Sequence, residues 1–250
     1  MTPMSKLTKF FGLLLISSLV GSAMGQAGPA AAKPLAAAVP GDNVHTPDDP
    51  DVLHETQLTV STPGYSGLIW WIPYEFWERS AARSGRAPDK TREAFKSLKD
   101  YTVVGIMVAK VSALGNFEYV TPSDLQKKTF VRDAVGKDYS AIPEVSGDAK
   151  MVADLMRPIL ANALGRAGEN FAMLFFPGRD LSGKQIADAV AKGQFSVVLK
   201  DTLGEPETIY QWRTPLTVFS APRYCPVGNE RLHANWDYCP WHGAKAVDRP

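Results

Sequence analysis

The residues best suited to chemistry lie together near the end of this 250-residue chain, at positions 224–243. This stretch contains both cysteines, Cys225 and Cys239, and two of the four histidines, His233 and His242. Thiolate sulfur and imidazole nitrogen are ligands that Zn²⁺ takes in proteins, and two cysteines can also form a disulfide. The stretch therefore predicts one of two structures, a metal site or a disulfide.

The order of residues in this stretch resembles that of the zinc ribbons, in which two Cys-Pro-x-Cys-Gly knuckles hold one tetrahedral zinc ion. Residues 225–227 begin a first knuckle, and residues 236–243, Trp-Asp-Tyr-Cys-Pro-Trp-His-Gly, match the second. The departures are at ligand positions, where Gly228 stands in place of the second cysteine and His242 in place of the fourth.

The resemblance implies a metal site with three ligands at family positions, Cys225, Cys239 and His242. His233 could supply the fourth ligand from a position that the family does not use. The protein is thus expected to have no cofactor, and zinc is the alternative. In that case, metal binding would be coupled to folding of the tail.

The competing interpretation is a disulfide between Cys225 and Cys239. Closing a loop of this length constrains the unfolded chain and stabilises the fold by about 3 kcal/mol in the entropy model. The ribbon framework that the resemblance implies would already bring the two sulfurs together. The compartment decides between the two interpretations, because disulfides persist in oxidising surroundings.

Residues 1–25 predict a secretory signal peptide. Lys6 and Lys9 form a basic start, and the apolar run at 10–20 has the length of a signal peptide rather than of a membrane span. Small residues at 23–25 suit cleavage, and an uncleaved membrane anchor is the alternative. Export predicts a periplasmic or secreted protein with no membrane span after cleavage, and it favours the disulfide over zinc.

Charge argues against two classes of partner. The whole chain has 27 basic and 26 acidic residues, and cleavage of the signal would remove Lys6 and Lys9 and no acidic residue, which leaves a mature net charge of −1. A near-neutral chain has no basic surface for nucleic acid or for an anionic membrane. We therefore expect a protein or glycan partner in the cell envelope and no nucleic acid.

The remaining chain is predicted to have three parts. Residues 26–52 are rich in Ala, Pro, Gly and Asp, a composition typical of a disordered linker. Residues 53–220 are long enough for one β-rich domain with a sizeable core. Residues 221–250 form the tail that resembles a zinc ribbon.

Hydrophobic patterns in residues 53–220 predict more strands than helices. The continuous apolar run 101–111 indicates a central strand buried on both faces. Further strands are predicted at 57–61, 68–72, 117–120, 128–134, 137–142, 171–176, 195–200, 207–212 and 216–219. Helices are predicted at 73–82, 88–100, 151–164 (with a kink or junction at Pro158) and 186–191.

These elements favour a mostly β (α+β) fold, a β-sandwich decorated with three or four helices. One hairpin turn resembles those of extracytoplasmic immunoglobulin-like sandwiches, which implies an immunoglobulin-like β-sandwich. The residues of this turn are Asp133, Gly136 and Tyr139, with Gly136 expected to take a positive φ.

Four aromatic residues close together predict either a binding surface or part of the core. They are Trp70, Trp71, Tyr74 and Trp77, at the junction of a strand and a helix. An exposed row would suit sugar stacking or a protein partner. The alternative is core packing at the corner, because aromatic side chains are buried far more often than they bind.

Patterns of known catalytic sites are missing from the sequence. There is no Gly-x-Ser-x-Gly elbow and no His-Glu-x-x-His helix. Residues 178–185 match the phosphate-binding loop motif except at the last position. Gln185 stands there in place of the hydroxyl residue that would hold magnesium. Glu75 and Glu78 could share a helix face, with no nearby pattern that supports acid–base work. The chain is therefore predicted not to be an enzyme.

The function expected from the sequence is an exported, non-catalytic binding or structural module of the cell envelope with a disulfide-pinned tail. The first alternative is an extracytoplasmic zinc-binding protein that uses the Cys/His cluster. The second is an exported hydrolase with a site assembled from distant residues.

Overall fold

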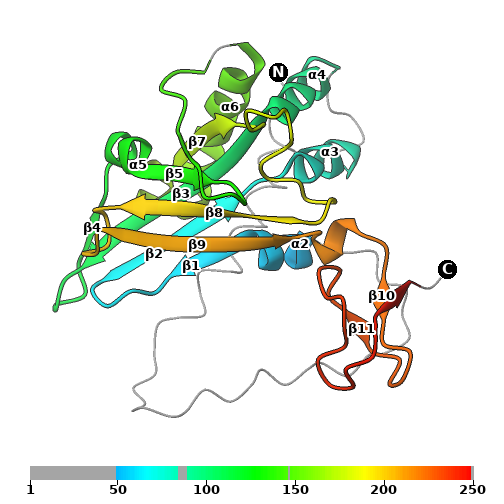
Figure 1. Ribbon diagram of the computed structural model, residues 1–250. Helices are drawn as coiled ribbons and strands as arrows, with labels where there is room; N and C mark the ends of the chain where they lie inside the picture. The colour runs from blue at the N-terminus through cyan, green and yellow to red at the C-terminus, as the bar shows by residue number, and fades with distance from the viewer. Residues whose placement is uncertain (1–48, 84–88, 146, 249–250) are drawn as a thin grey trace.

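A computed structural model describes residues 49–83, 89–145 and 147–248 (Figure 1). The predicted signal peptide and most of the predicted linker lie outside the described residues. The described chain has two larger antiparallel sheets, a small antiparallel sheet near the C-terminus, and helices around them. The fold is thus mixed α+β with antiparallel sheets, as the sequence predicts at this coarse level.

The first large sheet is built around strand β3 (Tyr101–Val111). It pairs with β2 (Tyr65–Trp71), β4 (Phe117–Tyr119) and β7 (Ala172–Pro177), and β1 (Gln57–Val60) pairs with β2 at the edge. All residues of β3 from position 102 to 109 are buried, so both faces of the strand are covered. The prediction of a central strand at 101–111 is confirmed.

Close packing at the middle of β3 depends on Gly105. A Cβ atom at this position would overlap the ring of Phe171, which lies directly against the strand. A larger residue would have to displace that ring, so the glycine allows the segment before β7 to pack onto the sheet.

The second large sheet has the strand order β6-β5-β8-β9, and all of its pairs are antiparallel. Its strands are β5 (Thr129–Arg132), β6 (Asp138–Ser140), β8 (Gly193–Lys200) and β9 (Glu207–Thr214). The turn between β5 and β6 has Gly136 at φ 91°, as predicted. The Asp133 carboxylate accepts hydrogen bonds from the amides of Val135 and Lys137 and closes this turn.

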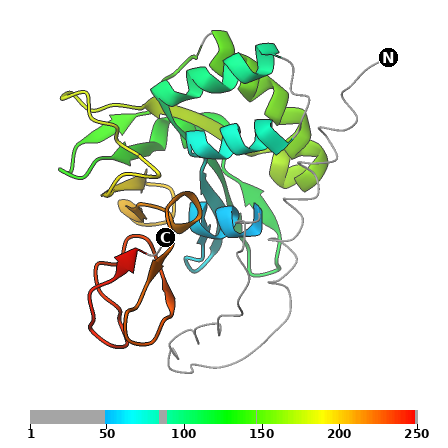
Figure 2. The same cartoon turned by 90° about the vertical axis from the view of Figure 1, so that its right-hand side faces the viewer.

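Within the described residues there are six α-helices, more than the three or four predicted. They are α2 (Asp49–Thr56), α3 (Tyr74–Arg83), α4 (Asp89–Ser97), α5 (Pro122–Lys128), α6 (Gly147–Leu164) and α7 (Arg166–Glu169), with 3-10 turns η2 (Leu98–Asp100) and η3 (Thr217–Phe219). Helices α3, α4 and α6 lie on one side of the molecule (Figure 2). Helix α2 begins four residues inside the predicted linker, and α6 continues through Pro158 as one element.

Two local predictions were wrong, and side-chain hydrogen bonds explain why. Residues 186–191 do not form a helix, because the Asp188 carboxylate accepts the amides of Val190 and Ala191 and ties them in a local turn. The predicted strand at 216–219 is also absent, because residues 217–219 form η3, and the Glu55 carboxylate accepts the amide of Val218 within that turn.

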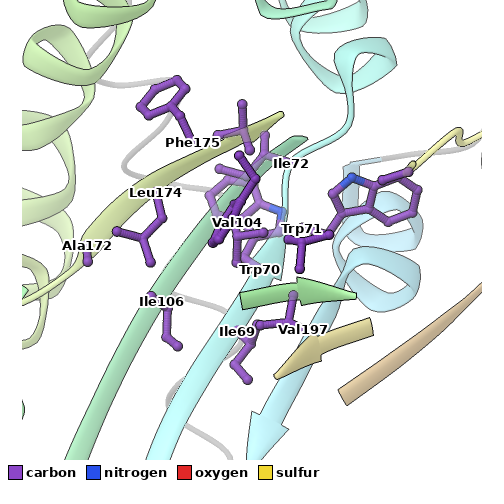
Figure 3. Close-up of a cluster of buried hydrophobic side chains, with 14 of the residues drawn as sticks. Ile69, Trp70, Trp71, Ile72, Val104, Ile106, Ala172, Leu174, Phe175 and Val197 are labelled. Atoms are coloured by element: carbon purple, nitrogen blue, oxygen red, sulfur yellow. The ribbon is translucent and has the colours of Figure 1, made fainter. Parts of the chain in front are cut away.

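The tryptophans at the strand–helix junction belong to the core, so the predicted aromatic binding surface is wrong for them. Trp70, Trp71 and Trp77 are each at most 1 % exposed. The Trp71 ring lies 4.7 Å from the ring of Phe195 in β8 and 6.4 Å from that of Trp212 in β9. Trp71 thus fills the space between the two large sheets, within the cluster of buried side chains shown in Figure 3.

Tyr74, the fourth aromatic residue of the predicted surface, is half-buried, and the Lys99 ammonium lies over its ring at 4.5 Å. It does not stand in an exposed aromatic row, because the three tryptophans beside it in the sequence point into the core.

The C-terminal unit, defined here as residues 221–248, is set to one side of the two large sheets (Figures 1 and 2) and has its own small core. Its sheet has the order β11-β10-β12, with β10 (Arg223–Tyr224), β11 (Arg231–Leu232) and β12 (Val247–Asp248). The buried residues form a cluster separate from the main core: Cys225, Leu232, Cys239 and Ala246. Both cysteines therefore lie at the centre of this unit.

Candidate metal centre

The first cysteine begins a tight turn closed by two backbone hydrogen bonds. The amide of Asn229 donates to the carbonyl of Cys225 at 3.0 Å, and the amide of Cys225 donates to the carbonyl of Glu230 at 2.9 Å. Asn229 takes φ 63°, a left-handed conformation that asparagine tolerates better than most residues. Pro226 at the second position fixes φ near the value that such a turn requires.

The second cysteine begins a turn of the same construction. The amide of Gly243 donates to the carbonyl of Cys239 at 2.8 Å, the amide of Cys239 donates to the carbonyl of Ala244 at 2.8 Å, and Gly243 takes φ 62°. Each turn thus has its bonds at the same offsets, a proline after the cysteine and a left-handed residue four positions on. The unit contains two equivalent knuckles, and the position three residues after the cysteine is Gly228 in one and His242 in the other.

The two knuckles bring four potential ligands together. The Nδ1 atom of His242 lies 3.4 Å from the Sγ of Cys225 and 3.5 Å from the Sγ of Cys239. A carboxylate oxygen of Glu230 joins them, and the four ligand atoms all lie within 4.8 Å of one another. Three of these residues were predicted as ligands, and the fourth is new.

The spacing fits a tetrahedral zinc ion. With Zn–S near 2.3 Å and Zn–N near 2.0 Å, a tetrahedral site separates sulfur from nitrogen by about 3.6 Å and nitrogen from oxygen by about 3.4 Å. The sulfur–Nδ1 separations are 3.4 and 3.5 Å, and Oε1 of Glu230 lies 3.7 Å from Nδ1 of His242. A disulfide between the cysteines would not require either the imidazole or the carboxylate at these distances.

Glu230 occupies the space that the second ligand of the first knuckle would use. A Cβ atom at Gly228 would overlap the Glu230 carboxylate. The φ of Gly228 is not in the left-handed region, so a side chain there would require the Glu230 carboxylate to move but would not strain the backbone. Oε2 of Glu230 is buried and has no hydrogen-bond partner among the described residues. A buried carboxylate oxygen without a donor is costly unless a cation satisfies it.

The surroundings of the Cys239 sulfur favour the thiolate. Burial alone raises the pKa of Cys239, but hydrogen bonds from the amides of His242 and Trp241, together with contacts to the His242 ring and Cys225, bring that pKa below its ordinary value. The amide of Gly228 donates to the Sγ of Cys225 at 3.4 Å. The thiolate is the form that binds metal, so the second knuckle stabilises the ligand state of Cys239.

His233, the predicted fourth ligand, does not join this cluster. Its Nδ1 lies 3.4 Å from Oγ1 of Thr217 and 3.7 Å from Oε1 of Glu55, and its ring lies 4.7 Å from that of Trp236. Leu232 points into the small core, and side chains alternate along an extended segment, so Glu230 shares the face of Leu232 while His233 faces the other way. Glu230 therefore replaces His233 in the set of four.

The Glu55–Thr217–His233 cluster instead joins the C-terminal unit to the rest of the protein. Burial raises the pKa of Glu55, but hydrogen bonds with His233, Thr217 and the Val218 amide outweigh it, so the pKa lies below its ordinary value. The Thr217 hydroxyl also accepts the amide of Ala234. Glu55 and Thr217 approach the same nitrogen of His233, so the three residues are not arranged as a nucleophile–base–acid relay.

A cleft of about 550 Å³ lies where α3 and η3 meet the C-terminal unit, lined by residues that include Glu75, Glu78 and Arg231. Burial, followed by the charges of Asp188 and Glu78, raises the pKa of Glu75. The two glutamates that the sequence analysis considered for acid–base work thus do lie together. Ser220 also lines this cleft, and its hydroxyl donates to the carbonyl of Leu216 at 2.7 Å.

Comparison with known proteins adds no further assignment, because no protein-family model, curated protein or solved structure matches this chain. Among the described residues, no helix has the length and apolar character needed to cross a membrane.

The sequence analysis missed Glu230, although the sequence contains a usable pattern. Gly228 removes a ligand from the first knuckle, and a carboxylate follows two residues later. The Glu230 side chain can reach the position of the missing ligand only if the chain folds back after the turn. The hydrogen bond from the Cys225 amide to the Glu230 carbonyl holds the chain in that fold.

Proposed function

We propose that the C-terminal unit binds one Zn²⁺ ion through Cys225, Cys239, His242 and Glu230, and that the protein is an exported binding or structural module stabilised by this site. One observation carries the proposal: the imidazole nitrogen of His242 lies at tetrahedral ligand separation from both sulfurs.

The donor set favours zinc over other divalent cations. Two thiolates and an imidazole are soft and borderline ligands, which suit Zn²⁺ and exclude Mg²⁺ and Ca²⁺, since those ions take oxygen ligands. Four ligands from two tight turns form a closed set, as structural zinc sites require. The metal would stabilise a unit whose own buried cluster has only four residues, too few for a stable fold by apolar burial alone.

The wider setting belongs to the same proposal. The signal-like residues 1–25 support export to the periplasm or the exterior, and the near-neutral charge supports a protein or glycan partner in the envelope rather than nucleic acid. The sandwich arrangement is also proposed, because Trp71 packs between the two large sheets against Phe195 and Trp212.

A disulfide between Cys225 and Cys239 is the second candidate state of the same site. Both cysteines are buried and free in the structure, and their Sγ atoms lie within 4.8 Å of each other. An oxidising compartment favours this state, which would pin the tail without a metal. The two states exclude each other, because zinc binding requires both thiolates.

Native mass spectrometry of the mature protein, purified without chelator or reductant, tests the proposal. We expect the mass of one bound zinc ion, lost in the Cys239→Ser variant and retained in Tyr238→Phe, a substitution of the exposed neighbouring residue. A mass lower by two hydrogens and without zinc would establish the disulfide instead. Apo protein that fails to take up added Zn²⁺ after reduction would refute the zinc site.

A further inference from the structure

We propose that Glu230 is a displaceable ligand, so that this site exchanges its zinc with an incoming nitrogen donor rather than holding the metal permanently. The inference rests on the proposed zinc site and concerns how that site loads and releases the ion. Three independent features of the four ligands lead to it.

The first feature is unequal burial. Cys225 and Cys239 are 0 % and 1 % exposed, whereas the side chains of His242 and Glu230 are 34 % and 31 % exposed. The two sulfurs are thus enclosed, whereas the side chains of His242 and Glu230 reach the surface in part. An incoming ligand can approach the metal position from the side of His242 and Glu230.

The second feature is the difference in supporting hydrogen bonds. The amide of Gly228 donates to the Sγ of Cys225, and the amides of His242 and Trp241 hold Cys239. Oε2 of Glu230 receives no hydrogen bond from the described residues. Ligands are fixed in position by the groups behind them, so the thiolates are held and the carboxylate is not.

The third feature is that Glu230 closes the first knuckle through its backbone carbonyl and not through its side chain. The carboxylate fills the side-chain space of Gly228 from two residues further along the chain. It can therefore leave without any movement of the turn that holds Cys225. A ligand at position 228 itself would be part of the turn and could not leave in this way.

The exchange step follows from these features. The Zn–O bond to Glu230 breaks, a bond from zinc to the incoming nitrogen forms, and the carboxylate moves into solvent with its charge unchanged. No oxidant or reductant is needed, because zinc keeps its oxidation state. Cys225, Cys239 and His242 hold the ion during this step and release it in the steps that follow.

Zinc transfer from the loaded, reduced mature protein to the chelator 4-(2-pyridylazo)resorcinol tests the inference, with the transfer rate measured by stopped-flow absorbance. The matched variant is Gly228→Cys/Glu230→Ala, which places a thiolate at the ribbon position and removes the carboxylate. We expect it to bind one zinc ion and to release it at least tenfold more slowly than the wild type. Glu230→Gln should release zinc roughly tenfold faster, and Glu118→Gln, at an exposed position on β4, should match the wild type.

The outcomes separate the two proposals. If the wild type and Gly228→Cys/Glu230→Ala each bind one zinc ion and release it at rates within a factor of about two, the exchange inference is overturned and the zinc site stands. If the reduced wild type binds no zinc, both fall. Cobalt substitution controls for misfolding, because a third thiolate in the double variant must strengthen the sulfur-to-cobalt charge-transfer band.

Discussion

The main body of the protein and its C-terminal unit are held together in different ways. The body has a continuous core in which residues from both large sheets and several helices are buried, with Trp71 and Phe195 in ring contact at its centre. The small core of the C-terminal unit consists of four buried residues, of which two are cysteines. Apolar burial can stabilise the first region, whereas the second needs a cross-link, either a metal or a disulfide.

The contact between the two regions includes several polar interactions. His233 meets Glu55 and Thr217, Lys192 forms an ion pair with Asp237, and the side chain of Asn235 donates to the carbonyl of Arg213. Polar contacts of this kind fix the position of a unit but contribute little stability. We therefore expect each region to respond mainly to changes in its own core.

The largest effect should come from the body. Trp71→Ala should lower the free energy of unfolding by about 3–5 kcal/mol, because it leaves a cavity between the two sheets. Urea unfolding followed by circular dichroism measures the loss. Trp241→Ala, at a position 53 % exposed in the C-terminal unit, is the control and should leave the main transition unchanged. Equal shifts for the two variants would contradict a body held by its aromatic core.

The next effect should be confined to the C-terminal unit. Cys239→Ser should lower zinc affinity by at least about 100-fold, because it removes a thiolate ligand. Limited proteolysis should then cleave within residues 221–248, while the main unfolding transition of the body stays in place. A loss of stability in the body of more than about 2 kcal/mol would show that the two regions fold as one.

The two histidines of the unit separate metal binding from docking. His242→Ala should abolish stoichiometric zinc binding, whereas His233→Ala should retain it and weaken the docking of the unit by about 1 kcal/mol, through loss of the contacts with Glu55 and Thr217. Isothermal titration with Zn²⁺ measures the first effect, and faster hydrogen exchange at the amides of Val218 and Ala234 measures the second. Loss of zinc in His233→Ala would return that residue to the ligand set.

The smallest effect concerns charge on the second sheet. Arg132 lies against Asp138, and hydrogen bonds from Arg132 and then Lys200 lower the pKa of Asp138 from 3.8 to about 2. A depressed carboxyl pKa stabilises the folded state above the unfolded pKa, and this stability is lost as the pH falls from about 4 to about 2.

Because Asp138 is partly exposed, the contribution should be about 1 kcal/mol. Urea unfolding at pH 6 and pH 2.5 measures this contribution in the wild type and in Arg132→Met. The free energy of unfolding should change less between the two pH values in Arg132→Met, by about 1 kcal/mol. An unchanged pH dependence in Arg132→Met would contradict the assignment. Lys150→Met, which removes an exposed ion pair with Asp154, is the matched control.

Patterns confined to one segment predicted their part of the fold well. The apolar run 101–111 predicted a strand buried on both faces, and Gly136 predicted the turn between β5 and β6. Predictions failed where a distant or polar group competes with the local preference. The Asp188 carboxylate accepts a hydrogen bond from the amide of a near neighbour in the sequence, which keeps that segment out of a helix. The Glu55 carboxylate accepts the Val218 amide, although the two residues lie far apart along the chain.

For the candidate site, the sequence by itself determined the two knuckles. Each is a local turn, in which a proline and a left-handed Asn229 or Gly243 set the backbone within six residues of the cysteine. This is why three of the four ligands could be named from residue order alone.

Only the tertiary structure decided the fourth ligand and the location of the tryptophans. Glu230 rather than His233 meets the sulfurs, because the alternation of side chains after the first knuckle turns one toward the small core and the other toward Glu55. Trp70, Trp71 and Trp77 are buried because a second sheet and helices cover them. Both outcomes depend on which face of a segment is covered by distant parts of the chain, and residue spacing carries no information about that.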